Sequence, residues 1–517
     1  MVIRRLIAPH LDFSALRREL DLPVGFPLAA QREAEETAAA GPPAGATDRT
    51  DIPLVTIDPP GSMDLDQAMF LERRDGGFRV RYAIADVSAF VRPGSAIATE
   101  AWHRGQTVYL PDGRVPLHPT ELSEGVASLL PDQVRPAVLW TIDLAADGTT
   151  TAARPERATV RSRARLNYPG VQADAGAGTL HPSIALLPEI GKLLIDLGLA
   201  RGGINLPIPS QEVEQVEGGW ELVLRAPLPV EDFNAQISLL TGVAAAKIML
   251  DGGVGLLRTM PKPDLRAVAA LRTAAGPLGI PWPDGAGPGR VIASVDGNDP
   301  RGAAFLEHAA DLFRGAGYTA FDGSVPELHE HAGVAAPYAH VTAPLRRLAD
   351  RYATEVCLAL TAGRPVPDWA REALAKLPEV MASTDRTASA AGRGAVDLAE
   401  AVLLSGRVGE QFEAAVLDVD EPHTHGHQPT QAQQSNQGQQ SNQGQQPNQG
   451  QQPNHADSAP KPPRGTVAID HPAVRARCEG PGLVPGQRIP VRLAVADPVA
   501  RRVLFQTVAP ESARMAT

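Results

Sequence analysis

Residues 54–68 read L-V-T-I-D-P-P-G-S-M-D-L-D-Q-A, and this stretch decides the fold around it. Its first four residues are apolar or β-branched, which predicts a short buried strand that delivers Asp58 at its end. The Pro-Pro-Gly that follows permits neither strand nor helix and predicts a tight loop. That loop brings Asp64 and Asp66 back towards Asp58, where three like charges repel one another unless a cation lies between them. Oxygen ligands at this density favour Mg²⁺ or Mn²⁺ over zinc.

Two other interpretations of the acidic stretch compete with a metal site. A solvated acidic turn has the same composition and stays open at this point. A calcium loop of the EF-hand type needs Gly at its sixth position and Glu at its twelfth. Counting from Asp64, these positions hold Met69 and Asp75, so the EF-hand is excluded.

Length and composition predict a soluble protein of several domains. A chain of 517 residues suffices for about three domains, and 43% hydrophobic with 21% charged residues is typical of globular proteins. No apolar stretch approaches the roughly eighteen residues that cross a membrane, and no export signal precedes Pro9. The two cysteines, Cys357 and Cys478, lie far apart, which argues against a disulfide framework or a zinc site. We therefore expect a cytoplasmic protein without a membrane partner.

The net charge of −11 argues against a protein that coats duplex DNA, but it permits a nuclease with a local basic channel. Two groups of arginines could line such a channel or could be ordinary solvated faces. They are Arg161, Arg163 and Arg165, which would share one face of a strand, and Arg346, Arg347 and Arg351.

Hydrophobic periodicity predicts an α+β domain followed by a small β-barrel. Alternation over 78–84 and 138–144 predicts strands of a substantial sheet, whereas apolar residues recur at helical spacing after Pro229. We expect further helices at 264–275, 303–314, 344–360 and 383–405, and a strand at 411–419. The expected domains are an extension with short helices (1–48), the α+β domain (49–405) and the barrel (406–421 and 464–510).

A Gln/Asn-rich tract interrupts the barrel at 422–463 and contains Q-Q-S-N-Q-G at a period of six. Such a tract has almost nothing to bury, so we expect a disordered insert in a barrel loop. His423, His425 and His427 precede the repeats and could bind a metal ion, although a polar loop is the favoured interpretation.

Five segments in order resemble one family. They are T-I-D-P-P-G-S-M-D-L-D-Q-A, Y-A-I-A-D-V-S-A-F-V-R-P-G-S, Y-L-P-D-G-R-V-P-L-H-P-T-E-L-S-E-G-V-A-S-L, S-R-A-R-L-N-Y and Y-A-H-V-T-A-P-L-R-R-L-A-D-R. Together they resemble the RNB catalytic domain of the ribonuclease II and ribonuclease R exoribonucleases, and the C-terminal barrel resembles the S1-type OB domain of these enzymes. The resemblance implies a mixed sheet with surrounding helices, and Mg²⁺- or Mn²⁺-dependent 3′ to 5′ hydrolysis of single-stranded RNA to nucleoside 5′-monophosphates. We expect a monomer.

The resemblance assigns the acidic positions first. Asp58, Asp64 and Asp66 match three of the family's four acids, which hold two metals and position the attacking water. Asp66 is expected to be the central catalytic residue. The fourth acid is replaced by Gln67, whose amide oxygen can bind Mg²⁺ but carries no charge, so one metal should bind more weakly.

The segment T-A-P-L-R-R places Arg346 on the family's arginine that grips a phosphate and stabilises the transition state. Thr342 and Pro344 predict a helix start with Arg346 in its first turn. Arg347 is expected to contact RNA as well. A pair between Arg346 and Asp350 is disfavoured, since that order opposes the helix dipole.

Three further residues match positions that bind the 3′ end. Tyr109 and Tyr168 are expected to stack on or clamp the last nucleotides, which suits an enzyme that accepts every base. Glu231 matches an acid expected near the terminal ribose, with a register slip to Asp232 as the alternative.

Two departures from the family bear on activity. Besides Gln67, the stretch before the acidic strand is too short to hold the two cold-shock domains that the family usually carries, which places processivity and action on structured RNA in doubt. The alternatives are a weakened RNB protein that binds RNA 3′ ends as a regulator, and a Mg²⁺-dependent phosphatase of small substrates. The OB barrel disfavours the phosphatase.

Overall fold

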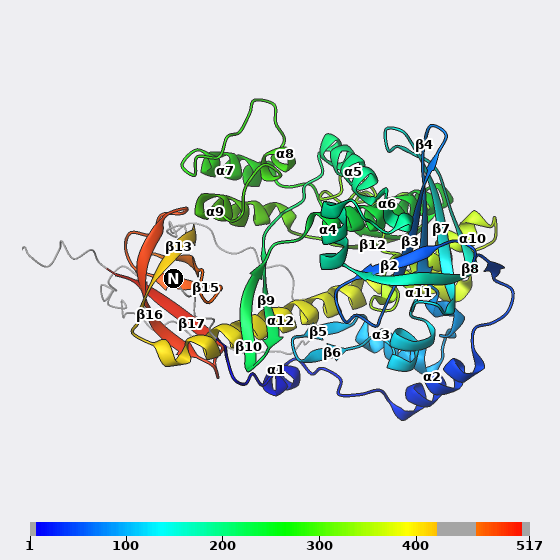
Figure 1. Ribbon diagram of the computed structural model, residues 1–517, viewed down its shortest axis with the longest axis horizontal. Coiled ribbons are helices and arrows are strands. Elements are labelled where there is room, and N and C mark those ends of the chain that lie inside the picture. Colours follow the sequence, from blue (N-terminus) through cyan, green and yellow to red (C-terminus); the bar gives the residue numbers. More distant parts are fainter. Residues whose placement is uncertain (1–6, 421–461, 509–517) are drawn as a thin grey trace, which may run out of the picture.

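The computed structural model describes residues 7–420 and 462–508. A mixed sheet covered by helices lies at one end of the molecule and a small barrel at the other, and the long helix α12 (Leu377–Leu404) runs between them (Figure 1). The predicted α+β domain followed by a barrel is confirmed.

The main sheet has six strands in the order β1-β8-β2-β3-β4-β7. Their bounds are Thr47–Asp48 (β1), Leu54–Asp58 (β2), Gln67–Arg74 (β3), Gly77–Ala85 (β4), Val134–Ala145 (β7) and Thr150–Asn167 (β8). The long strand β8 pairs antiparallel with β7 through 150–161 and parallel with β2 through 162–167. The strands β2, β3, β4 and β7 lie side by side, and β8 pairs with the first and the last of them. This pairing with β8 holds the end of β2 in place.

Both faces of this sheet are buried, because successive residues of a strand point to opposite faces. Along β4, Val80, Tyr82 and Ile84 pack into one core, while Ala83 and Ala85 pack into another. Arg163 and Arg165 of β8 reach backbone oxygens of Thr50 and Ser62, on the two loops that flank β2. The pairing of β8 with β2 shifts register between Ser162 and Arg165, within this run of arginines.

The helices after β8 cover the first of these faces. Their bounds are Tyr168–Ala177 (α4), Leu187–Arg201 (α5), Pro229–Gly252 (α6), Leu348–Thr361 (α10) and Asp368–Leu374 (α11), and the strand pair β11 (Val254–Thr259) and β12 (Gly317–Asp322) lies among them. Of the helices in the described ranges, α6 alone is long and apolar enough to cross a bilayer. This helix corrects the expectation that no apolar stretch approaches that length, and half of its apolar window is buried inside the protein.

A group of shorter helices has its own core next to the barrel. It comprises α7 (Leu265–Ala275), α8 (Pro288–Ile292) and α9 (Pro300–Ala309). The helix predicted at 264–275 is confirmed by α7. The one predicted at 303–314 begins earlier, at Pro300, because Asp299 caps the helix by accepting hydrogen bonds from Arg301 N and Gly302 N, and it ends in a 3₁₀ turn over 310–313.

The barrel consists of five strands closed in the order β13-β14-β15-β17-β16. Their bounds are Gln411–Val419 (β13), Arg464–Ile469 (β14), Val474–Glu479 (β15), Arg488–Asp497 (β16) and Arg502–Thr507 (β17). The strand predicted at 411–419 matches β13. Residues 421–461, with most of the predicted insert and the three histidines before its repeats, lie outside the described residues.

The N-terminal segment is packed along the rest of the molecule. Its helices are α1 (Ser14–Glu19) and α2 (Leu28–Ala40), in agreement with the short helices expected in this segment. Ala8 bridges to Trp220 in the hairpin of β9 (Ser210–Val216) and β10 (Gly219–Arg225). Leu16 lies against Gly394 of α12, and Glu33 accepts a hydrogen bond from Ile97 N in α3 (Ala96–Arg104). The segment therefore ties the two ends of the molecule together.

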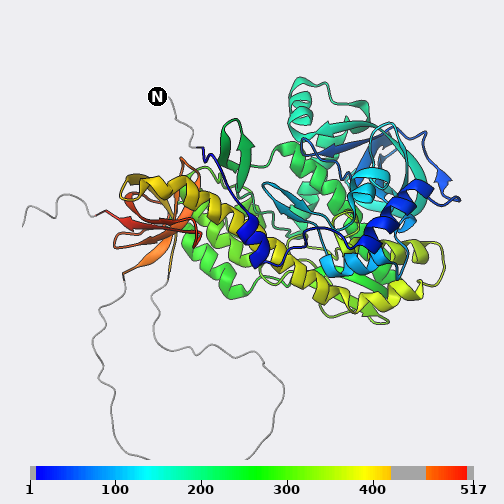
Figure 2. The ribbon, with the colours of Figure 1, turned by 90° about the horizontal axis from the view of Figure 1, so that it is seen from below.

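Helix α12 contacts both parts of the molecule along one continuous axis (Figure 2). Near its start, the side chain of Thr384 fills the space beside Gly105, in the turn after α3. Near its end, Glu400 accepts a hydrogen bond from the backbone of Arg475 in the barrel. The relative placement of the sheet and the barrel thus depends on this helix.

Candidate active site

The acidic stretch folds as its sequence predicts. Asp58 is the last residue of β2, Gln67 is the first of β3, and the turn between them has Gly61 at a φ of +84°, a conformation that glycine adopts without strain. The loop is held in place because Leu65 N donates to Ser128 Oγ at 3.0 Å and Ser128 Oγ donates to the carbonyl of Met63 at 2.6 Å.

Asp66 lies at the centre of the site and is almost fully buried. Its Oδ1 accepts a hydrogen bond from Leu345 N at 2.8 Å, and its Oδ2 lies 3.2 Å from Arg346 Nε. Burial raises the pKa of Asp66 to about 8, although Arg346 opposes that rise. Asp66 Oδ2 has an ion-pair neighbour but no partner in hydrogen-bond geometry.

Asp58 presents a second uncompensated oxygen, since its buried Oδ2 has no hydrogen-bond partner. Burial raises its pKa to about 7, while Arg346 and Arg165 favour its ionised form. The two carboxylates are therefore held in a desolvated place that favours either a proton or a cation.

The third aspartate is engaged differently from the other two. Asp64 Oδ1 accepts from Arg114 Nη1 at 2.7 Å, and its Oδ2 accepts from the Tyr109 hydroxyl at 3.1 Å. Tyr109 and Arg114 are paired across the hairpin of β5 (Val108–Leu110) and β6 (Gly113–Val115). Arg114 was not among the predicted site residues. The two-residue turn Pro111-Asp112 pairs Leu110 with Gly113 and so places Arg114 opposite Tyr109.

The arginine loop, residues 342–347, faces the acidic loop, which is the turn between Asp58 and Gln67. The prediction that Arg346 lies in the first turn of a helix is wrong, because α10 begins only at Leu348. Asp350 is fully buried and its Oδ1 accepts from Ala343 N at 2.7 Å, which holds the preceding residues in a separate turn. The disfavoured pair with Asp350 is formed by Arg347 instead, and Arg346 pairs with Asp66, which was not predicted.

Arg347 points away from the acidic loop. Its Nε and Nη2 lie 3.0 and 2.8 Å from the two oxygens of Asp350, an arrangement that suits the fork of a guanidinium. Its role as an RNA contact stays a prediction. Through Asp350, which also binds Ala343 N, Arg347 stabilises the side of the arginine loop that faces away from the acidic residues.

Gln67 is inserted between the sheet and the arginine loop. Its Nε2 donates to the carbonyl of Thr342 at 2.6 Å, and its Oε1 accepts from the Tyr82 hydroxyl at 2.9 Å. Tyr82 in turn lies 2.8 Å from Ser238 Oγ on α6. Neither Tyr82 nor Ser238 was predicted, because their spacing is that of ordinary strand and helix core positions.

The remaining predicted residues lie on α4 and α6, and Tyr168 follows Asn167, the residue of β8 that pairs with Asp58. Tyr168 begins α4 directly after β8, and its hydroxyl accepts from Asn234 Nδ2 at 3.0 Å. Glu231 accepts from Arg225 Nη2 at 2.5 Å and from Leu228 N at 2.6 Å, so it caps α6. For the neighbouring Asp232, burial raises the pKa. The assignment of a ribose contact to either residue stays a prediction.

The donor set fits a divalent cation at Asp58 and Asp66, whose unpartnered buried oxygens a hard cation would satisfy. Within the described ranges, no group of three or more His, Cys, Asp or Glu side chains is arranged as a metal site. The difference from the expected triad arises at Asp64, because Arg114 and Tyr109 hold that carboxylate. Gln67 as a ligand stays a prediction, since both atoms of its amide are already bonded.

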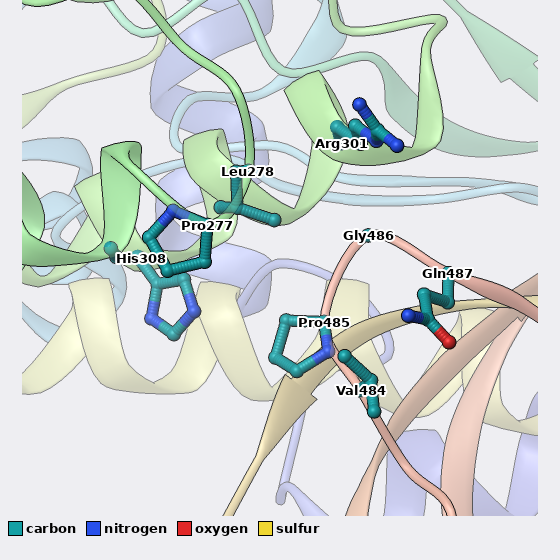
Figure 3. A pocket seen from close by; sticks show the side chains of 9 residues that line it. Pro277, Leu278, Arg301, His308, Val484, Pro485, Gly486 and Gln487 are labelled. Atoms are coloured by element: carbon teal, nitrogen blue, oxygen red, sulfur yellow. The ribbon is translucent and has the colours of Figure 1, made fainter.

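A cavity of about 290 Å³ lies elsewhere, between α7, α9 and the barrel loop at 484–487 (Figure 3). Leu278, Arg301 and His308 face this loop, and the cavity contains none of the predicted site residues.

Comparison with known sequences identifies the same two regions. The profile described as the RNB domain matches residues 46–360, and the profile of the RNase II-type exonuclease C-terminal S1 domain matches residues 456–508. Ribonuclease R of Escherichia coli is 28% identical over 441 residues, covering 78% of this chain and 52% of that protein. Exoribonuclease 2 of an Enterobacter species is 36% identical over 158 residues, covering 30% of this chain and 24% of that protein. The chain thus spans about half the length of the ribonuclease R that it matches.

Solved structures share the fold. The structure of Mycoplasma genitalium RNase R in complex with ribose methylated single-stranded RNA has a TM-score of 0.77 at 19% identity, covering 97% of this chain and 78% of that one. Yeast Ssd1, described as a pseudonuclease, has a TM-score of 0.60 at 18% identity, covering 76% of this chain and 49% of that one.

Proposed function

Since the chain belongs to the RNB family of ribonucleases, we propose that it is a 3′ to 5′ exoribonuclease that hydrolyses single-stranded RNA to nucleoside 5′-monophosphates with Mg²⁺ or Mn²⁺. The observation that carries the proposal is Asp66, a buried carboxylate with one unpartnered oxygen, facing the half-exposed Arg346. The buried carboxylate of Asp66 can bind a metal ion, and the guanidinium of Arg346 beside it can reach a phosphate in solvent, so the pair suits a phosphate that carries a bound metal ion.

In this proposal Asp58 and Asp66 hold the metal, with Asp64 beside them. In a two-metal site, the bound ions supply a hydroxide nucleophile at neutral pH and neutralise the leaving oxygen. Asp66 has a further task, since its Oδ1 holds Leu345 N and so orients the arginine loop towards the phosphate.

Arg346 is proposed to bind the phosphate next to the reacting bond. Its side chain is 46% exposed, so its guanidinium can turn from Asp66 towards a ligand in the solvent-facing half of the site. A planar guanidinium binds two phosphate oxygens at once and stabilises the charge that develops on them.

Tyr109 and Tyr168 are proposed to hold the last nucleotides. Tyr109 is 49% exposed, although its hydroxyl is fixed on Asp64, so a base can stack on its ring. Stacking of this kind contributes about 1–3 kcal/mol per base and accepts any base.

A basic groove is proposed to guide the rest of the strand. This groove, a cavity of about 840 Å³ along α12, is lined by Arg258, Arg386 and Arg393, with Asp385 among them. Arg258 lies 4.8 Å from the centre of the Tyr318 ring, and the Tyr318 hydroxyl lies 2.7 Å from Nδ1 of His340, two residues before Thr342. The groove thus adjoins the segment that leads into the arginine loop.

The second candidate is an RNB protein that binds RNA 3′ ends without cleaving them. Three contacts favour it, namely the pair of Asp64 with Arg114 and the hydrogen bonds of the two Gln67 amide atoms within the protein. The similarity to yeast Ssd1, whose description is that of a pseudonuclease, is compatible with it.

The test incubates the purified chain with 5′-labelled single-stranded RNA and Mg²⁺ or Mn²⁺, beside an EDTA control. Asp66→Asn is compared with Asp75→Asn, which changes an exposed aspartate in the turn between β3 and β4. Stepwise shortening from the 3′ end that needs metal and is lost only in Asp66→Asn supports the exonuclease. RNA that is bound by the wild-type protein and stays intact supports the binder instead.

A further inference from the structure

Gln67 lies where its amide nitrogen can donate a hydrogen bond, which a carboxylate cannot do. It lies on β3 directly after Asp66, and its side chain reaches both Tyr82 on β4 and the carbonyl of Thr342 in the arginine loop. Tyr82 is fully buried and Thr342 is almost so, hence water is a poor substitute for either contact.

The hydrogen bonds fix which way the amide points. Its nitrogen faces the Thr342 carbonyl, which can only accept, and its oxygen faces the Tyr82 hydroxyl, which donates to it. A flipped amide would set two acceptor oxygens against each other at 2.6 Å, so the network determines the orientation. A carboxylate at position 67 would create the same clash of acceptors, because it has no hydrogen to donate.

The contact matters because residues 66 and 67 together hold both ends of one short loop. Gln67 binds the loop at Thr342, while Asp66 binds it at Leu345 N and lies beside Arg346. Between these points Ala343 N donates to Asp350, and the His118 ring bonds the Pro344 carbonyl. Beyond Leu345, the Arg346 carbonyl accepts from Thr107 N at 3.0 Å. The bond from Gln67 is therefore the contact that fixes the start of this loop, and it is one of those that set the position of Arg346 over Asp66.

We propose that Gln67 is a positioning residue, which fastens the arginine loop to the acidic strand and thereby sets Arg346 for phosphate binding, and is not a metal ligand. This inference rests on the proposed function for its consequence in RNA binding. It explains why an amide stands where the family has a fourth acid, since the Thr342 carbonyl requires a donor.

The test compares Gln67→Met, which keeps the length of the side chain but removes both hydrogen-bonding atoms, with Gln67→Glu, which removes only the donor. Gln215→Met and Gln215→Glu are the matched controls, because Gln215 is exposed on β9. Hydrogen exchange of peptides that cover 342–350 is measured without RNA or metal. We expect several-fold faster exchange in both Gln67 variants and no change in the controls.

Two further readouts are independent of cleavage. Mn²⁺ affinity, measured by the electron paramagnetic resonance of free Mn²⁺, is expected to change less than twofold in Gln67→Met. Affinity for single-stranded RNA in EDTA is expected to fall in Gln67→Met about as far as in Arg346→Ala, and Gln67→Met should add little when Arg346 is already alanine.

A tenfold loss of Mn²⁺ affinity in Gln67→Met with unchanged hydrogen exchange would show that Gln67 is a ligand and would overturn the proposal. Independent, multiplicative losses of RNA affinity in the double variant would overturn it as well. If the wild-type protein cleaves no RNA, the exchange and Mn²⁺ measurements still decide the role of Gln67, so the two proposals fail separately.

Discussion

Asp66 and Leu345 lie 279 positions apart in the chain, and the Leu345 amide donates a hydrogen bond of 2.8 Å to the carboxylate of Asp66. The central acid of the site and the loop that carries its arginine are therefore one assembly. Changes that break this bond should affect both metal binding and phosphate binding.

Asp66→Asn should abolish hydrolysis while RNA stays bound. The Asn oxygen can still accept from Leu345 N, so the arginine loop keeps its place, but the negative charge that holds the cation is removed. We expect single-turnover cleavage to fall by at least about 100-fold, as for removal of one key electrostatic group. RNA affinity in EDTA should stay within a few-fold of wild type. Full activity of the variant would exclude Asp66 as the central residue.

Mg²⁺ or Mn²⁺ should stabilise the folded protein against heat. Asp58 and Asp66 are buried carboxylates with unpartnered oxygens, and a ligand present at 100 times its Kd stabilises the state that binds it by about 2.7 kcal/mol. Differential scanning fluorimetry with and without EDTA measures the shift in melting temperature. The shift should vanish in the Asp58→Asn, Asp66→Asn double variant, and an equal shift there would place the metal elsewhere.

The free energy of unfolding should depend on pH through Glu400, which lies where α12 meets the barrel. Glu400 Oε1 accepts from Arg475 N and from Gln211 Nε2, each at 2.8 Å, and burial raises its pKa from 4.5 to about 7. Because the folded state favours the protonated form, this stabilisation is full below pH 4.5 and is lost as the pH rises through about 7. The loss amounts to about 3 kcal/mol at one pKa unit per 1.4 kcal/mol.

The isosteric Glu400→Gln variant tests this dependence, since it keeps the acceptor oxygen without the charge. Between about pH 5 and about pH 8, its free energy of unfolding should fall less than that of the wild type, and it should be the more stable protein at the upper end. The exposed Glu413→Gln on β13 is the control. Parallel pH profiles for wild type and Glu400→Gln would contradict the assignment.

Arg386→Ala and Arg393→Ala should weaken RNA binding in a salt-dependent manner. Both arginines are exposed on α12 and line the basic groove. Each arginine that no longer neutralises a phosphate of a single strand makes the slope of log K against log salt shallower by about 0.7. Fluorescence anisotropy at several salt concentrations measures the slope, and Arg290→Ala on α8 serves as an exposed control. An unchanged slope in the double variant would show that RNA does not bind in the groove.

The barrel should tolerate removal of the Gln/Asn-rich tract. Val419 and Gly465 are paired across β13 and β14, and Asp420 N donates to the carbonyl of Arg464 at 2.8 Å. A short Asn-Gly turn can therefore join the two strands in place of 421–463. We expect the melting temperature and RNA affinity of this variant to match the wild type. A protein that no longer folds would show that the tract contributes to the barrel.

The sequence predicted the parts of the site that depend on local order. The apolar run before Asp58, the Pro-Pro-Gly turn and the alternation along β4 placed the acidic loop correctly. The sequence could not predict that α10 begins only at Leu348. This start depends on a hydrogen bond from Ala343 N to the buried carboxylate of Asp350, which forms only in the folded structure. Arg114 and Tyr82 were missed for the same reason, since their roles arise only when separate elements meet. The N-terminal segment was taken as an extension because its weak amphipathic pattern does not reveal that it spans both ends of the molecule.

Helix α12 also sets the spacing between the hairpin of β5 and β6 and the barrel. Thr384 touches the turn that leads to the Tyr109 hairpin, and Glu400 touches the barrel. The stretch of helix between these two residues rises about 24 Å along a straight axis. A nucleic acid strand that engages the hairpin and the barrel together must bridge roughly that distance, so fragments below a threshold length can be gripped at one end only. In the proposed exonuclease, the length of this one helix would set the product size at which the RNA is released.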